Sequence, residues 1–255
     1  MPGIRKYCLV VVLPILILIN GCAIISGVQA EEDRDTKIAE TNLSLGIGYL
    51  KQGKLDDALE KLLKAEDAKP GDAAVHSVLA LVYDQMQEYD KADRHYRRAI
   101  DLNAEEGGYY NNYGAFLCRH GKYQEADKYF NKAVNTLRYK TPESALENAG
   151  VCAAQIPNAE KAEDYLRKAL SINDKLPVAL AEMADLMFKK QNYLSTRAYL
   201  QRFGEVSKPT ARSLWLGIRT ERKLGDKEAE ARYAKLLQSQ YPDSLEFKRW
   251  LKETP

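Results

Sequence analysis

The 255-residue sequence predicts an all-α protein built from repeated helical hairpins. Alanine recurs at intervals of 34 residues in two series, which comprise Ala58, Ala92 and Ala126 and, seven residues later, Ala65, Ala99 and Ala133. A period of about 34 residues is typical of helix-turn-helix repeats. No segment shows a sustained two-residue alternation of β-branched side chains, so no strand is expected.

Small and large residues also recur in step with this period. A small residue stands at the eighth position of each predicted repeat, in the series Gly46, Ala80, Gly114, Gly150, Ala184 and Gly217. A large residue stands in the second half of each repeat, in the series Leu62, Tyr96, Phe130, Leu166, Leu200 and Tyr233. We therefore expect six repeats, over 39–72, 73–106, 107–140, 143–176, 177–209 and 210–243, and a closing helix over 244–253.

Helix-breaking residues support these boundaries. Gly53, Gly121 and Gly225 fall between the two helices of their repeats, while Pro142 and Pro177 fall where a new repeat begins. Glycine suits the end of a helix, and proline suits its first turn. Larger residues interrupt the alanine series in the last two repeats, at Thr196, Phe203 and Leu236. We expect less regular packing there.

The period, the hairpin pattern and the alternation of small and large residues resemble the tetratricopeptide repeat. The resemblance implies a superhelix, because each hairpin buries its apolar side only by stacking on its neighbours. In such a superhelix the first helix of each repeat lines the inner face, which is where we expect a partner to bind.

The inner face of the first two repeats is predicted to be apolar. The residues expected there are Leu43, Ile47, Leu50, Val78 and Leu81. Packing within one repeat does not require such a strip, so it favours a groove for a helix or segment of a partner protein. The alternative is that the N-terminal segment, or the superhelix itself, covers the strip.

The inner face becomes polar in the third and fourth repeats, where Asn112 and Asn148 occupy the same position. A carboxamide both donates and accepts hydrogen bonds, so these side chains are candidates to hold the backbone of a bound peptide. The alternative is that each asparagine bonds a helix end of its neighbour.

The N-terminus has a different character. Arg5 and Lys6 precede an apolar run over residues 8–19, which is typical of a secretory signal peptide. The sequence Ile19-Asn20-Gly21-Cys22 resembles a bacterial lipobox, although Asn20 is atypical. We predict a signal peptide over 1–21, a lipid on Cys22, a flexible tether over 22–38 and a repeat domain over 39–255. An ordinary cleaved signal ending near Ala30 is the alternative.

Charge and motifs exclude several classes of function. The chain has 38 basic and 36 acidic residues, and removal of residues 1–21 makes the two numbers equal, which argues against a nucleic-acid partner. Residues 48–55 imitate a phosphate-binding loop, but Leu55 stands where a hydroxyl is required. No nucleophile or paired-acid motif is present, so we expect neither an enzyme, nor a cofactor, nor a small-molecule substrate.

The histidines and cysteines are candidates for metal ligands and disulfides. His76, His95 and His120 lie 19 and 25 residues apart, without the short spacings of zinc sites, so we expect no metal. Cys118 and Cys152 fall in the first helices of adjacent repeats. They are candidates for a disulfide or for buried free thiols, and spacing alone does not decide between the two.

The whole chain resembles the type IV pilus biogenesis lipoproteins of the PilW/PilF type, also called pilotins. The strings that carry the resemblance are Gly21-Cys22, residues 45–50 (LGIGYL), 111–117 (NNYGAFL), 181–186 (AEMADL) and 211–219 (ARSLWLGIR). The resemblance implies an outer-membrane lipoprotein whose repeat domain lies in the periplasm. It also implies that the protein binds secretin subunits and promotes their outer-membrane localisation and multimerisation. The alternative is a repeat scaffold for another periplasmic assembly, such as the peptidoglycan or outer-membrane-protein machinery.

Overall fold

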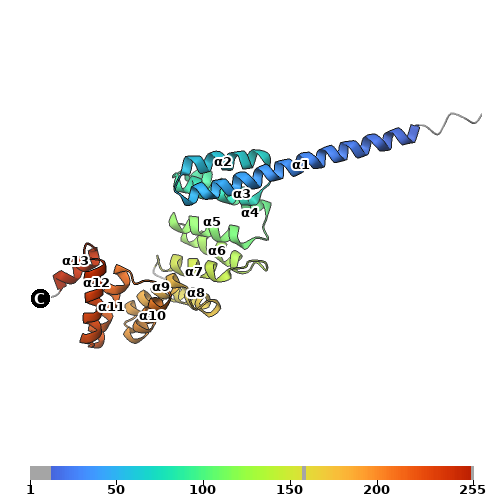
Figure 1. Cartoon of the computed structure of the whole chain (residues 1–255). Coiled ribbons are helices and arrows are strands. Elements are labelled where there is room, and N and C mark those ends of the chain that lie inside the picture. Colours follow the sequence, from blue (N-terminus) through green and yellow to red (C-terminus); the bar gives the residue numbers. More distant parts are fainter. Residues whose placement is uncertain (1–12, 157–158, 254–255) are drawn as a thin grey trace, which may run out of the picture. The chain divides into compact units, whose positions relative to one another are not determined.

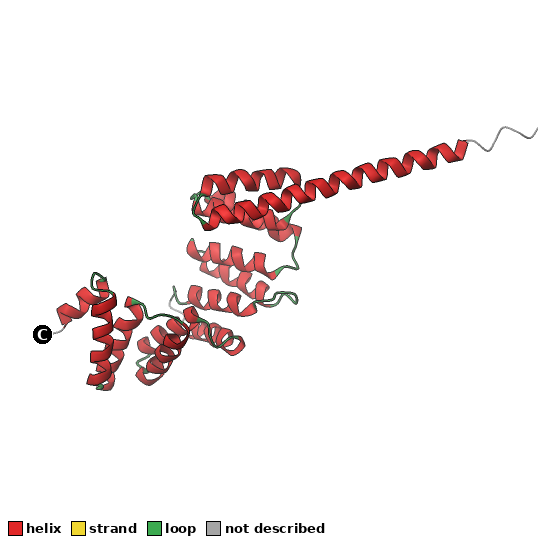
Figure 2. Cartoon of the chain, viewed as in Figure 1, coloured by secondary structure: helices red, strands yellow, loops and turns green. Residues whose placement is uncertain are grey.

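A computed structural model describes residues 13–156 and 159–253, with side chains placed in 31–156 and 160–253. The described residues form thirteen α-helices and contain no strand (Figures 1 and 2). The helices are α1 (Leu13–Lys51), α2 (Leu55–Ala68), α3 (Ala73–Gln85), α4 (Tyr89–Leu102), α5 (Gly107–Arg119), α6 (Tyr123–Val134), α7 (Pro142–Ala153), α8 (Ala159–Ile172), α9 (Pro177–Lys189), α10 (Tyr193–Val206), α11 (Ala211–Leu224), α12 (Lys227–Gln240) and α13 (Leu245–Glu253). The all-α prediction is confirmed.

Consecutive helices pair into six hairpins, and α13 follows them. The first helices of repeats two to six begin within one residue of the predicted repeat starts. The chain divides into two compact units, of which the first ends at Asn103 and contains α1 to α4. The second begins at Ala104 and contains α5 to α13.

Small residues allow the two helices of a hairpin to approach closely. A Cβ atom added to Gly150 would lie 2.6 Å from Cγ of Leu166, and one added to Gly46 would lie 2.7 Å from Cγ of Leu62. Gly114 and Gly217 meet Phe130 and Tyr233 in the same way. The predicted alternation of small and large residues therefore describes the contact between paired helices.

The turn inside five of the hairpins contains a residue in the left-handed conformation. The residues with positive φ among the described ones are Gly53, Gln87, Gly121, Gln191 and Gly225, with φ between 59° and 78°. They occupy equivalent places in five of the six hairpins, and the turn of the fourth, at 157–158, lies outside the described residues. Two of the five are glutamines, for which this conformation is unfavourable.

The last hairpin is closed by α13. Phe247 and Trp250 of α13 pack against a buried cluster that includes Leu214, Ile218 and Leu237. Helix α13 therefore covers apolar side chains that another repeat would otherwise cover. Of the three residues that interrupt the alanine series, Thr196 and Phe203 are buried and Leu236 is exposed.

The prediction of a flexible tether over 22–38 differs from the structure, in which α1 runs continuously through these residues. The segment contains no proline and only Gly27 as a strong helix breaker, and it leads directly into the first helix of repeat one. Burial begins at Ala39, whereas residues 31–34 are exposed. The helical conformation thus extends beyond the packed repeats.

The predicted signal peptide is only partly covered by the structure. Residues 1–12, including its basic head, lie outside the described residues, and the backbone from residue 13 onward belongs to α1. Within the described part of the chain, no helix has the length and apolar character needed to cross a membrane. Cleavage after residue 21 and lipidation of Cys22 remain predictions.

Candidate partner-binding surface

The predicted apolar strip begins on α1. Leu43 and Ile47 are half-buried, one helical turn apart, and line the same shallow depression. The depression is lined by Glu40, Leu43, Ser44, Ile47, Gly48 and Lys51. A Cβ atom added to Gly48 would meet nothing within 4 Å, so the backbone is open to a partner at this point. Apolar side chains at its centre and charged ones at its ends suit a short amphipathic segment.

The other residues of the predicted strip are Leu50, near the end of α1, and Val78 and Leu81, on α3, and all three side chains are half-buried. Helices α1 and α3 contact each other within the first compact unit. The start of α3 is fixed by Asp72, whose carboxylate accepts hydrogen bonds from the backbone N–H groups of Ala74 and Val75. Val78 and Leu81 therefore stand on a helix with a well-defined start.

Of the two asparagines predicted to hold a peptide backbone, Asn112 and Asn148, the second is already hydrogen-bonded within the protein. Asn148 Nδ2 of α7 donates to Asn111 Oδ1 of α5 over 3.0 Å, so this carboxamide already has a partner within the second compact unit. The alternative expectation was a bond to a helix end, whereas the observed bond is to a side chain of a neighbouring helix. Asn112, which the sequence pairs with Asn148, is half-buried on α5. The structure thus gives Asn148 a role in helix contact.

Glu147 lies beside Asn148 and extends this polar contact to the next repeat. Its Oε1 accepts from the backbone N–H of Ala179, in the first turn of α9, over 2.8 Å. Burial raises the pKa of Glu147, and the bond from Ala179 acts in the opposite direction. Polar side chains therefore join α5, α7 and α9.

The two cysteines of the repeat domain form a disulfide. Cys118 of α5 and Cys152 of α7 are bonded, with Cα atoms 5.8 Å apart. That separation lies within the range that disulfides require. The bond ties the third repeat to the fourth, and of the two outcomes left open by the sequence the structure has the bonded one.

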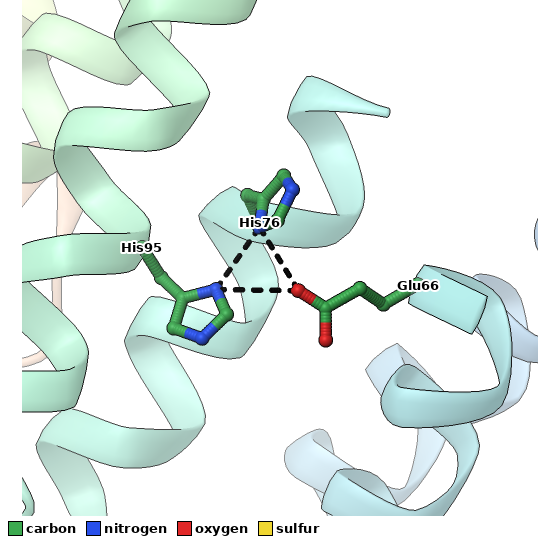
Figure 3. A group of neighbouring side chains, drawn as sticks. All are labelled: Glu66, His76 and His95. Atoms are coloured by element: carbon green, nitrogen blue, oxygen red, sulfur yellow. Dashed lines mark hydrogen bonds and ion pairs between the residues drawn. The ribbon is translucent and has the colours of Figure 1, made fainter. Parts of the chain in front are cut away.

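A second group of side chains meets in the first compact unit (Figure 3). Nδ1 of His76 on α3 lies 3.0 Å from Nδ1 of His95 on α4, and Oε1 of Glu66 on α2 lies 3.4 Å from the former and 3.9 Å from the latter. The spacing of the histidines along the chain, from which no metal was expected, did not indicate this group of potential ligands. His76 and His95 belong to the two helices of one hairpin, which brings residues 19 positions apart face to face.

Burial lowers the pKa of His95 to about 4, with a smaller contribution from His76. The imidazole of His95 is therefore neutral at neutral pH. Knowledge of which faces of paired helices oppose each other could have revealed this cluster, whereas residue spacing along the chain did not.

Comparisons with known proteins fit the repeat architecture. A tetratricopeptide-repeat family model matches residues 43–92 and 77–138. The type IV pilus assembly protein PilF of Pseudomonas aeruginosa is 33% identical over 239 residues, which cover 92% of this chain and 94% of that protein. The chain belongs to the PilF family. Its fold is that of the type IV pilus tetratricopeptide-repeat proteins.

Solved structures agree with membership in the PilF family. A structure of P. aeruginosa PilF matches with a TM-score of 0.78 and 32% identity, over 86% of this chain and 99% of that one. A structure of PilW, described as a widely conserved type IV pilus biogenesis factor, matches with a TM-score of 0.76 and 27% identity, over 84% and 98%. The PilF-family relationship supports a role in type IV pilus biogenesis.

Proposed function

We propose that this chain is an outer-membrane pilotin lipoprotein, which binds secretin subunits and promotes their localisation and multimerisation in the outer membrane. Membership in the PilF family supports the pilus role, and the proposal extends it to a specific partner. A repeat scaffold acts by holding other proteins, so no catalytic step is part of the proposal.

The open depression on α1 is the observation that carries this proposal. Leu43 and Ile47 line it one helical turn apart, and two adjacent apolar side chains in an open depression favour contact with a partner. The strip is short and bordered by Glu40 and Lys51, so it fits an apolar segment of a partner chain and not a lipid bilayer. We assign this segment to the secretin.

The lipid anchor belongs to the same proposal. Cys22 carrying two or three acyl chains would hold the protein at a membrane, because two or more acyl chains give stable anchoring. The Cys118–Cys152 bond is compatible with export, since disulfides persist outside the reducing cytoplasm. The anchor would retain a captured secretin subunit at the membrane in which it assembles.

Substitution of Ile47 tests the partner site. We expect Ile47→Glu to reduce secretin capture at least tenfold in a pull-down, because a carboxylate placed in a desolvated apolar contact costs several kcal/mol, or about tenfold for each 1.4 kcal/mol. Circular dichroism should show unchanged helicity, since the Ile47 side chain is half-exposed.

Leu45→Glu is the matched control, because Leu45 is 46% exposed on the same helix but does not line the depression. It should leave secretin capture unchanged. Equal capture by wild type and Ile47→Glu would remove the strip as the binding site.

A further inference from the structure

Three potential metal ligands converge in the first compact unit, from three different helices (Figure 3). Glu66 stands near the end of α2, His76 in the first turn of α3 and His95 in the middle of α4. We propose that Glu66, His76 and His95 form a binding site for one divalent transition-metal ion of the Zn²⁺ class. This inference is independent of the proposed secretin partner.

The spacing of the ligand atoms fits such an ion. The triangle formed by His76 Nδ1, His95 Nδ1 and Glu66 Oε1 has sides of 3.0, 3.4 and 3.9 Å. The point equidistant from its corners lies about 2.0 Å from each, which is the usual Zn–N and Zn–O bond length. Two tetrahedral ligands at that bond length are about 3.3 Å apart, close to the sides of this triangle. Little movement is needed to coordinate an ion.

The hydrogen bond of His76 sets the imidazole up as a ligand. His76 Nε2 lies 3.0 Å from the backbone oxygen of Pro70, which can only accept, so the proton resides on Nε2. Nδ1 of His76 then carries a lone pair directed at His95 and Glu66. Metal-binding histidines typically donate their other N–H to a carbonyl or carboxylate in this way.

Without a cation, acceptors crowd this site. The lone pair of His76 Nδ1 and the carboxylate of Glu66 face each other over 3.4 Å, and Nδ1 of His95 lies 3.0 Å from the former and 3.9 Å from the latter. When His95 is protonated at Nδ1, the two acceptors share that single proton. A metal ion would occupy the place of that proton once His95 adopts the tautomer protonated at Nε2, and it would then attract all three atoms at once. The arrangement is therefore better matched to a cation than to a hydrogen-bonded triad.

The surroundings hold the ligands in place and leave a route for the ion. The ring of His95 stacks on Tyr83, with centroids 5.2 Å apart, and His76 is 6% exposed. The Glu66 side chain is 29% exposed, so an ion can enter from that side. Two imidazoles and one carboxylate suit Zn²⁺ and Co²⁺, with solvent water completing a four-coordinate shell.

A bound ion would connect the first repeat to the second. Glu66 belongs to the second helix of repeat one, and both histidines belong to repeat two. His76 also shares α3 with Val78 and Leu81, two residues of the apolar strip. Metal binding would thus stabilise the junction on which that part of the strip depends.

The test is a titration of the full chain, in detergent and without a polyhistidine tag, with ZnCl2 by calorimetry and with CoCl2 by visible spectroscopy. Cys8 and Cys22 are changed to serine in every sample, which leaves the bonded Cys118–Cys152 pair as the remaining cysteines. We expect about one ion per chain, the intense visible bands of tetrahedral Co²⁺, and a higher Tm with Zn²⁺.

Variants of the ligands locate the ion. His76→Gln and His95→Gln should abolish the Co²⁺ bands, and Glu66→Gln should weaken binding at least about tenfold, since changes outside the ligand shell alone cost 10–100-fold. His120→Gln is the matched control and should bind as the parent does. Glu66→Gln alters a partly exposed side chain, so it keeps the test valid if a histidine variant unfolds. Absence of binding in the parent, or unchanged binding in Glu66→Gln with native helicity, overturns the proposal.

Discussion

Single residues decide how closely the two helices of a hairpin approach. Gly150 of α7 faces Leu166 of α8, and a Cβ atom at Gly150 would also lie 3.3 Å from the backbone oxygen of Ala162. The nearest obstacle is the branch point of a leucine, which can move only if the buried side chain changes its rotamer or the helix shifts. The size of the residue at this position is therefore tied to the separation of the helix axes.

We expect Gly150→Ala to lower the free energy of unfolding by about 1–3 kcal/mol, because an extra methyl group in a filled core forces neighbours off their preferred positions. Gly204→Ala is the matched control. Gly204 lies inside α10 with nothing within 4 Å of an added Cβ, so the change should raise stability by about 0.5–1 kcal/mol through helix propensity alone. Urea unfolding followed by circular dichroism measures both, and a neutral or stabilising Gly150→Ala would contradict the close approach.

At the scale of the helical element, the turn of each hairpin shows what the sequence reveals and what it does not. Gly53, Gly121 and Gly225 could be predicted as turn residues, because glycine tolerates positive φ. Gln87 and Gln191 adopt the same conformation without any local preference for it, and only the repeat register indicates their role. The backbone bonds that end the preceding helix, from Glu88 N–H to Tyr83 O and from Asn192 N–H to Met187 O, go with this conformation.

Gln87→Gly should therefore raise the free energy of unfolding by about 0.5–1 kcal/mol. Glycine removes a left-handed strain of about 1–2 kcal/mol, and its greater freedom in the unfolded chain cancels part of the gain. The reverse change at the equivalent position, Gly121→Gln, should be destabilising by a similar amount. Thermal unfolding of the two variants tests this, and destabilisation by Gln87→Gly would show that its side chain makes a contact that outweighs the strain.

The sequence predicted local features better than contacts between helices. The hairpin boundaries followed from the alanine period, and the repeat register placed Leu43 and Ile47 on one face of the first helix. The Glu66–His76–His95 cluster did not, because it requires knowing which faces of α2, α3 and α4 meet. The Asn148–Asn111 bond was not predicted for the same reason. The helical conformation of residues 22–38 was not predicted either, because a helix can continue beyond its packed part where the sequence contains no signal that ends it.

At the scale of the whole molecule, the proposed pilotin function requires a lipid on Cys22 in addition to the repeat domain. Cys22 lies on α1 well before Ala39, where burial begins, so the anchor and the packed repeats are separate parts of the chain. Loss of the lipid should change the location of the protein without changing its fold.

We expect Cys22→Ala to give a folded protein in the soluble periplasmic fraction, with fewer assembled secretin rings. Cys8→Ala is the matched control, because Cys8 precedes the predicted cleavage site and should leave the protein in the membrane fraction. Fractionation with immunoblotting measures the first effect, and a Cys22→Ala protein that remains membrane-bound contradicts the lipid anchor.

The Cys118–Cys152 bond has a mechanical consequence. It spans a sequence separation of 34 residues, which would extend by roughly 110–120 Å if pulled straight. Tension applied through the two ends of an oxidised chain bypasses this segment, since the load passes across the sulfur atoms. Each stretched molecule is shorter by that length until a reductant opens the bridge, so the redox state of its surroundings sets how far the chain can lengthen under load.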